Sequence, residues 1–274
     1  MSTFRPKQIT QYQASHMAEL VGGTSEEVTA ESLCLLPKTI EPDAVIHDNA
    51  CGAAPATAVV MEQHPLTITI HATDLNPVFV DGVAAMAKEK GWPVTAAVMD
   101  VKKLDFPDNK FTHTFFTFSC PLLKAGGAAE TYRTLQPGGI CIATTPTYLP
   151  HIDALCRTHH AIRGADAPLP PFLNHKYTTD TLLDGLLSGG FERDKIVVHE
   201  TKASMVVPDV KHWIQLAWSY VGTPEGGWIP EDEVHWDEAI KMGAEELEKQ
   251  PGVSRNADGA LVMVMDATIA IATK

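Results

Sequence analysis

One segment organises the rest of this chain, and it reads Val45-Ile46-His47-Asp48-Asn49-Ala50-Cys51-Gly52-Ala53-Ala54-Pro55. An apolar run ends in a carboxylate, passes through a turn of small residues and opens into a predicted helix over 55–63. This order of strand, acid, turn and helix is how an α/β sheet presents backbone N–H groups to a nucleoside-containing ligand. A turn of small residues can also simply let a helix pack closely on a sheet, so the flanking sequence has to decide between the two readings.

Strands and helices alternate on both sides of this segment. Through the first half the pattern predicts strands over 45–47, 66–72, 94–99, 111–118 and 140–145, with helices over 55–63, 76–90 and 128–135. Such alternation with short connections is typical of a parallel sheet covered on both faces. The second half predicts helices over 150–162, 178–187, 212–221 and 232–250, and strands over 195–199 and 260–272. The chain shows no internal repeat, so a single domain over 1–274 is expected.

The first 40 residues predict two helices separated by Gly22-Gly23. One interpretation is a helical pair that packs on the side of the domain. The other is a lid over a ligand pocket, with Tyr12 and His16 on one helical face because they are four residues apart.

Composition limits the classes of partner. The chain carries 21 basic and 34 acidic residues, a formal net charge of −13. An acidic surface repels phosphate backbones and anionic lipids, so we expect a small-molecule substrate and neither nucleic acid nor membrane as partner. The five cysteines show no Cys-x-x-Cys pair, which favours reduced thiols in the cytoplasm. The N-terminal residues lack the apolar region of a secretory signal, and no apolar run reaches the roughly 18 residues of a membrane helix.

Two more acids follow the second and third predicted strands. Asp74 is placed to accept hydrogen bonds from a ribose diol; it could also cap the helix that follows, or do both. Asp100 could accept from an adenine amino group while Val101 packs on the ring, or it could be an ordinary turn residue. A reductase is disfavoured because the turn lacks a clean Gly-x-Gly-x-x-Gly. A zinc site at His151, Cys156 and His159 is disfavoured because no second cysteine pair lies nearby, and no metal is expected.

Two further turns carry a resemblance to a known family. They are Leu104-Asp105-Phe106-Pro107-Asp108-Asn109-Lys110-Phe111, before the fourth strand, and Leu135-Gln136-Pro137-Gly138-Gly139, before the fifth. With these turns, residues 44–145 resemble the core of the class I S-adenosylmethionine-dependent methyltransferases, most of all the ubiquinone-biosynthesis-type small-molecule branch found in many fungal secondary-metabolite enzymes. The sequence departs from that pattern in carrying alanine at two positions of the glycine-rich turn, and Thr112 where aspartate is common.

The resemblance implies a fold and a set of cofactor contacts. The fold is α/β, a Rossmann-like, seven-stranded, mostly parallel sheet with helices on both faces and an antiparallel last strand. Residues 1–40 would form a helical lid, 41–146 the cofactor-binding core, and 147–274 the substrate-side helices and last strands. S-adenosylmethionine would be contacted along its methionine portion, ribose, adenine and methyl group. The residues implied are Asp48, Asn49, Ala50, Gly52, Asp74, Leu75, Asn76, Asp100, Val101, Phe118 and Ser119.

The resemblance also implies the reaction, methyl transfer to O, S or N of a small apolar or aromatic metabolite. A sulfonium carries an excellent leaving group, so a general base is needed only when the acceptor is a high-pKa hydroxyl. Candidate bases are His16, His151 and His175, and candidate substrate contacts are Tyr12, His16 and Trp213. The alternative is a methyltransferase-like protein that binds the cofactor but acts as a cyclase or regulatory partner. The sequence does not predict an oligomeric state.

Overall fold

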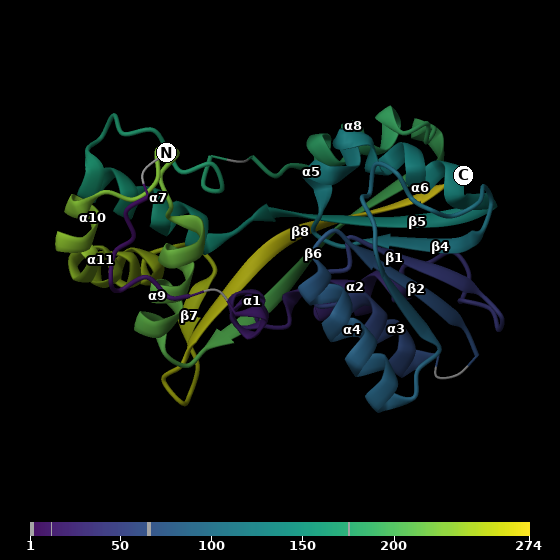
Figure 1. Cartoon of the computed structure of the whole chain (residues 1–274), viewed down its shortest axis with the longest axis horizontal. Coiled ribbons are helices and arrows are strands. Elements are labelled where there is room, and N and C mark those ends of the chain that lie inside the picture. Colours follow the sequence, from purple (N-terminus) through teal and green to yellow (C-terminus); the bar gives the residue numbers. More distant parts are fainter. Residues whose placement is uncertain (1–2, 12, 65–66, 175) are drawn as a thin grey trace. The chain divides into compact units, whose positions relative to one another are not determined.

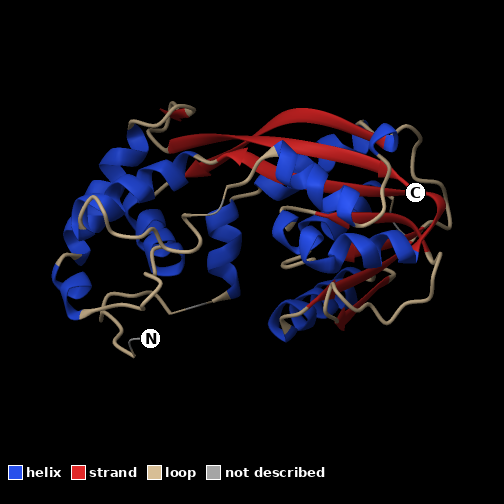
Figure 2. Ribbon diagram, turned by 90° about the horizontal axis from the view of Figure 1, so that it is seen from above, coloured by secondary structure: helices blue, strands red, loops and turns tan. Residues whose placement is uncertain are grey.

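The computed structural model describes residues 3–11, 13–64, 67–174 and 176–274. Its helices and strands are labelled in Figure 1 and coloured by type in Figure 2. The chain divides into two compact units. The core unit comprises Gly23–Thr147, Tyr177–Ala203 and Asp266–Lys274, and the helical unit comprises Met1–Gly22, Tyr148–Lys176 and Ser204–Met265. The single-domain expectation stays a prediction. The boundary between the units falls inside β6 (Ile196–Val207) and β8 (Leu261–Thr273), and before the last residue of β5 (Leu135–Tyr148).

The sheet has the strand order β3-β2-β1-β4-β5-β8-β6, with β7 paired to β8. Its first five strands pair in parallel: β1 (Val45–Asn49), β2 (Thr69–Asp74), β3 (Val94–Val98), β4 (Phe111–Phe116) and β5 (Leu135–Tyr148). The chain moves outward from β1 to β3 and then crosses back to place β4 on the other side of β1. This reversal is a topological switch point, where open α/β sheets bind ligands at the carboxyl ends of their strands.

Helices cover both faces of the sheet in the core unit (Figure 1). On one face lie α2 (Thr24–Cys34), α3 (Pro55–Gln63) and α4 (Pro77–Lys90). On the other lie α5 (Cys120–Leu122), η1 (Leu123–Gly127), α6 (Ala128–Thr134) and α8 (Thr179–Ser188), followed by η2 (Arg193–Lys195). Each face has its own apolar cluster, one around Phe116, Leu123 and Leu182 and one around Ala54, Ala72 and Val83.

The helical unit contains α1 (Ala14–Val21), α7 (Pro150–Arg163), α9 (Val210–Val221), α10 (Pro230–Val234), α11 (Trp236–Glu248) and β7 (Val253–Arg255). Its core includes Trp213, Trp218, Trp228 and Trp236. A buried ion pair crosses this core, because Arg163 Nε donates to Asp232 Oδ1 at 2.7 Å.

The structure confirms most predicted elements. It also confirms the predicted fold class, a mostly parallel α/β sheet with antiparallel pairing near the C-terminus. The predicted strand over 195–199 was too short, since β6 continues to Val207. Beyond His199 the strand pattern continues, because exposed positions at Glu200 and Lys202 alternate with less exposed ones. The helix predicted over 232–250 is interrupted at His235, and the short β7 was not predicted.

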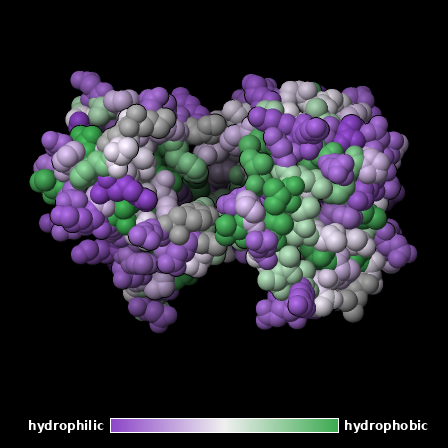
Figure 3. All heavy atoms as spheres, viewed as in Figure 1, coloured by the Kyte–Doolittle hydropathy of each residue, from purple (hydrophilic) through white to green (hydrophobic). Residues whose placement is uncertain are grey.

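The two helices of the first 40 residues belong to different units. In the core unit α2 packs against α3, and in the helical unit α1 packs against α9. The lid assignment stays a prediction. Among the described residues no helix is both long and apolar enough to cross a membrane. On the face seen in Figure 3, polar residues cover most of the surface, with an apolar area on the core unit.

Candidate functional site

The loop between β1 and α3 is built from residues in a left-handed conformation. Ala50, Gly52 and Ala54 have φ values of 55°, 53° and 59°. An alanine in this region strains the backbone, so surrounding contacts have to hold it. The N–H of Cys51 donates to the carbonyl of Thr73 at 2.9 Å, and that of Ala54 donates to the carbonyl of Cys51 at 2.7 Å. The loop is therefore a defined turn that places the N-terminus of α3 at the carboxyl end of β1.

Asp48 stabilises the N-terminus of α3. Its carboxylate is only 2% exposed, and Oδ2 accepts from the backbone N–H of Thr57 at 3.1 Å and from its hydroxyl at 2.6 Å. Thr57 is the third residue of α3, whose N-cap Ala54 has no side-chain oxygen to offer. Asp48 therefore performs the capping role from the neighbouring strand. Burial raises the pKa of Asp48 to about 6, against the opposing effect of the Thr57 hydrogen bonds.

Asp74 joins the loop to the end of β2. Its Oδ2 accepts from the N–H of Gly52 at 2.9 Å and its Oδ1 from the N–H of Asn76 at 2.8 Å. The cap of α4 is Asn76, whose side-chain oxygen accepts from Val78 N at 3.0 Å. The alternative in which Asp74 caps the helix is thus wrong, and its half-buried carboxylate stands at the carboxyl edge of the sheet.

An apolar surface lies beside Asp74. Leu75, Val78 and Val98 are 68%, 54% and 53% exposed. They lie close together along the sheet edge, because Leu75 follows Asp74, the register partner of Val98, and Val78 is in the first turn of α4. Asp100 is exposed, and its Oδ1 accepts from Lys102 N at 2.9 Å. Val101 was predicted to pack on an adenine ring, but its side chain is 6% exposed and belongs to a core cluster.

The loop after β4 is also strained. Phe118 has a φ of 51°, which is uncommon for an aromatic residue. Its N–H donates to the hydroxyl of Thr144 on β5 at 3.0 Å, so the neighbouring strand holds the conformation. Ser119 donates from its hydroxyl to the carbonyl of Thr117 at 3.1 Å. Strained backbone of this kind gathers at functional sites.

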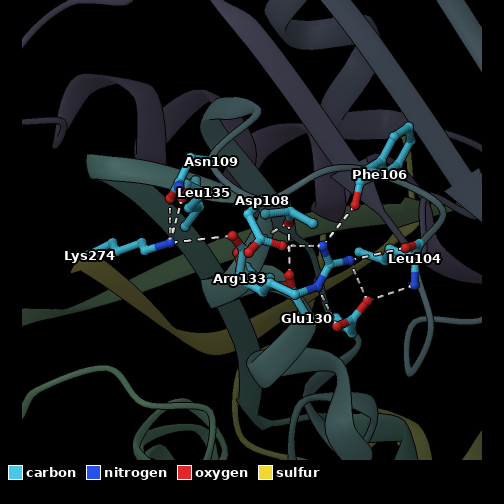
Figure 4. A network of polar contacts seen from close by, with 10 residues as sticks. Leu104, Phe106, Asp108, Asn109, Glu130, Arg133, Leu135 and Lys274 are labelled. Carbon is cyan, nitrogen blue, oxygen red and sulfur yellow. Dashed lines mark hydrogen bonds and ion pairs between the residues drawn. The ribbon is translucent and has the colours of Figure 1, made fainter.

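The turn before β4 is fastened to α6 by Arg133 (Figure 4). Its guanidinium donates to the carbonyls of Leu104 (3.0 Å) and Phe106 (2.8 Å), and it pairs with Glu130 and Asp108. At the end of the chain, Lys274 Nζ donates to the side chain of Asn109 at 2.9 Å. This turn, one of the two that carry the family resemblance, is thus a structural feature held by an arginine fork.

The sequence did not predict a group of hydroxyl and thiol side chains beside the loop after β4. Cys120, the residue after Ser119, is 4% exposed, and its thiol lies 4.0 Å from the hydroxyl of Thr181 at the start of α8. Thr145 on β5 contacts the same thiol. Tyr177 precedes the α8 N-cap, and burial, with a contribution from the Cys120 thiol, raises the pKa of its phenol. The members of this group come from segments far apart in the chain, so no local sequence signal marked it.

The predicted acceptor-side residues belong to the helical unit or lie outside the described residues. Tyr12 and His175 fall outside. His16 Nδ1 lies 2.6 Å from the Tyr220 hydroxyl. His151 packs edge-on against Trp213 at 5.2 Å, and burial lowers the pKa of His151 to about 4. Trp213 itself is 2% exposed within the core of that unit. All the predicted cofactor residues belong to the core unit.

Two other features lie away from this edge. A cavity of about 280 Å³ is lined by Asp43, Thr112, Gln136 and their neighbours, at the amino ends of β1 and β4 and thus opposite the loop. Within the described ranges, no three His, Cys, Asp or Glu side chains are grouped so that they could hold a metal ion.

Part of this arrangement matches a known family model. Residues 46–139 match the model of a methyltransferase domain. The matched residues contain the β1–α3 loop, Asp74, Asp100 and the loop after β4. No curated protein sequence matches the chain. The match supports the predicted methyltransferase core over these residues, and the ubiquinone-type or fungal branch stays a prediction.

Solved structures share the fold. The YcgJ protein from Bacillus subtilis superposes with a TM-score of 0.58 at 12% identity, covering 91% of this chain and 97% of that chain. The [4+2]-cyclase SpnF gives 0.50 at 21% identity, covering 91% and 79%. Geranyl diphosphate C-methyltransferase from Streptomyces coelicolor A3(2), in complex with S-adenosylhomocysteine, gives 0.50 at 16% identity, covering 90% and 79%. At such identities the likeness concerns the fold.

Proposed function

We propose that this protein is an S-adenosylmethionine-dependent methyltransferase that acts on O, S or N of a small, apolar or aromatic metabolite. The observation that carries the proposal is the position of Asp74 in the methyltransferase domain. Its carboxylate lies at the carboxyl edge of the sheet beside the switch point, bonded to the β1–α3 loop and next to an exposed apolar surface.

The residues at this edge fit the cofactor. An ionised carboxylate has about four acceptor positions, and Asp74 uses two of them for N–H groups of the chain, which leaves room for the two ribose hydroxyls. Leu75 and Val98 offer apolar contact to an adenine ring, and Asp100 is exposed beside them. The N-terminus of α3 and the loop N–H groups favour the carboxylate of the methionine portion.

The chain's own part in the reaction is to bind and align. S-adenosylmethionine, when bound, would supply a methyl group to a lone pair of the acceptor, with the carbon–sulfur bonding pair returning to sulfur and S-adenosylhomocysteine as the leaving group. Asp48 acts through the loop by capping α3, and Asp74 orients the sugar. Phe118 and Ser119 border the methyl end. Alignment of two reactants in this way can supply much of the rate.

Replacement of Asp74 by alanine tests the cofactor site. The change removes the acceptors for the ribose hydroxyls and for Gly52 N, and each hydrogen bond to a charged group contributes about 1.5–3 kcal/mol. Affinity for S-adenosylhomocysteine, measured by titration calorimetry, is expected to fall at least tenfold. Asp81→Ala, an exposed acid on α4, is the matched control and should bind like the parent. Unchanged affinity of Asp74→Ala would remove the assignment.

A second experiment separates methyl transfer from the alternative. The protein is incubated with methyl-deuterated S-adenosylmethionine and a panel of thiols, phenols and amines, and products are read by mass spectrometry. A labelled product identifies the acceptor atom. Cofactor binding without any labelled product would favour a cyclase or regulatory partner.

A further inference from the structure

Two loops leave the sheet side by side at the switch point. Strands β1 and β4 pair in parallel, with Asp48 opposite Phe115. β1 ends at Asn49 and β4 at Phe116, so each strand continues for one residue beyond this pair. The β1–α3 loop and residues 117–119, here called the β4 loop, therefore start at the same level of the carboxyl edge. A ligand bound at this switch point has the β4 loop as one of its walls.

The β4 loop holds a backbone conformation that its sequence disfavours. Phe118 has a φ of 51°, in the left-handed region where any side chain larger than that of glycine crowds the backbone. The Ser119 hydroxyl donates to the carbonyl of Thr117 at 3.1 Å, so this bond spans Phe118 without holding its N–H. Because such a conformation is unfavourable on its own, contacts from outside the loop have to hold it.

Thr144 supplies such a contact from the neighbouring strand. The N–H of Phe118 donates to the Thr144 hydroxyl at 3.0 Å. Thr144 lies on β5 directly after Ala143, the register partner of Phe116, and it is 1% exposed. Burial on a paired strand fixes the position of the hydroxyl before any ligand binds. Burial also keeps Thr144 away from a substrate, so it can act on one only through the β4 loop.

We propose that Thr144 is a positioning residue for methyl transfer, whose hydroxyl keeps Phe118 in the left-handed conformation and so fixes the β4 loop beside the bound cofactor. This inference rests on the proposed function, because that function assigns Phe118 and Ser119 to the border of the methyl end. The net contribution of one hydrogen bond corresponds to about a twofold to tenfold change in a conformational equilibrium. Loss of the hydroxyl therefore lets the β4 loop open measurably more often while β5 stays folded.

Hydrogen exchange of single amides tests the role without knowledge of the acceptor. Protein in which threonine carries a ¹³C carbonyl and phenylalanine carries ¹⁵N gives coupled NMR signals only from Thr-Phe steps. The sequence has three such steps, Thr3-Phe4, Thr114-Phe115 and Thr117-Phe118. The signals are assigned with Thr3→Ser, which removes the first, and Phe118→Leu, which removes the third. Phe115 is the internal control, because it is 1% exposed within β4 and reports on the stability of the sheet.

Three variants separate the hydroxyl from the rest of the side chain. Thr144→Val keeps the shape and removes the acceptor, so exchange at Phe118 is expected to accelerate at least threefold more than exchange at Phe115. Thr144→Ser keeps the hydroxyl and should restore slow exchange at Phe118. Thr134→Val is the matched control, because Thr134 is also buried but its hydroxyl donates to the carbonyl of Glu130 within α6, at the amino end of β5. It should leave the ratio of the two exchange rates as in the parent.

Saturating S-adenosylhomocysteine links the β4 loop to the cofactor. It is expected to slow exchange at Phe118 in the parent and to remove most of the difference between Thr144→Val and the parent. If S-adenosylhomocysteine binds by calorimetry but exchange at Phe118 stays as in the free protein, the inference is overturned while the proposed function stands. If S-adenosylhomocysteine does not bind, the proposed function fails, and the inference with it.

Two further results would overturn the role of Thr144. In one, Thr144→Val accelerates exchange at Phe118 and Phe115 equally, which shows that the hydroxyl only stabilises the sheet. The other concerns turnover of the acceptor from the metabolite panel, where Thr144→Val is expected to lower kcat about twofold to tenfold and to change KM for S-adenosylmethionine less than twofold. Thr144→Ser should recover kcat, and an unchanged kcat in Thr144→Val contradicts the inference.

Discussion

Asp48 and Asp74 both end a strand at the same edge of the sheet, yet their carboxylates have different surroundings. Asp48 is buried and hydrogen-bonded to Thr57, so it stabilises the loop from inside. Asp74 keeps free acceptor positions at the surface of the site. In the sequence the two acids look alike, because an acid after a strand carries no sign of which way its side chain is directed. We therefore expect different consequences when each is changed.

The Asp48 carboxyl should make stability depend on pH. Its pKa is raised from 3.8 to about 6, so the folded protein holds this proton more tightly than the unfolded chain. The stability it contributes is present below pH 4 and is lost as the pH rises through 6. Asp48→Asn cannot ionise and keeps an oxygen for Thr57 N. Between pH 4 and 7.5 its free energy of unfolding should gain on the parent by up to about 3 kcal/mol.

Urea unfolding at several pH values measures this difference. Asp81→Asn, an exposed acid on α4, serves as control and should follow the parent at every pH. A difference between Asp48→Asn and the parent that stays constant across the range would show that Asp48 does not titrate in this window.

At the scale of elements, the turn over 104–109 depends on a side chain from α6. The Arg133 fork satisfies two carbonyls of this turn and two carboxylates, and the N–H of Leu104 donates to Glu130 at 2.8 Å. The described segment between β3 and β4 contains no helix that could pack on the sheet. The hydrogen bonds from Arg133 and Glu130 fix this segment against α6 instead. Sequence reasoning recognised the turn but not its partner.

Arg133→Ala is expected to lower the free energy of unfolding by about 1–3 kcal/mol, because the carbonyls of Leu104 and Phe106 lose their donor. Arg133→Lys should recover only part of this, since an ammonium cannot reproduce the planar fork. Thermal or urea unfolding measures both. Arg157→Ala, an exposed arginine on α7, is the control. A loss for Arg133→Ala no larger than that of the control would contradict the bracing role.

At the scale of the whole molecule, β6 and β8 each contribute to both compact units. When one unit unfolds, β6 and β8 also lose backbone hydrogen bonds in their portions that belong to the other unit. We therefore expect one cooperative transition. Four of the five tryptophans lie in the helical unit and Trp92 lies in the core unit, so tryptophan fluorescence reports mainly on the helical unit. The proposed cofactor site belongs to the core unit.

Fluorescence and calorimetry should therefore give the same melting temperature. S-adenosylhomocysteine at one hundred times its Kd should raise both by several degrees, since ligand at this level adds about 2.7 kcal/mol. Two transitions, of which only the one that contributes little to the tryptophan fluorescence change responds to ligand, would show that the units unfold independently.

Several features followed from the sequence alone. The parallel core, the β1–α3 turn, the ends of α3 and α4, and the acids after the first three strands all rest on local signals: strand and helix periodicity, Pro at a helix start, Gly at a helix end, and an acid beside a small-residue turn. Local signals of this kind survive folding because neighbours in the chain remain neighbours in space.

Other features were decided only by the tertiary structure. The hydroxyl of Thr57 bonds to Asp48, Val101 is buried, and Arg133 pairs with Asp108, 25 residues earlier in the chain. Each of these depends on how a side chain packs in the folded molecule, and the residue alone carries no sign of it. Side-chain direction and burial are properties of the packed molecule. The carboxyl edge of the parallel sheet could thus be predicted from the sequence, whereas the role of each side chain along it depends on the side chains that it contacts in the folded molecule.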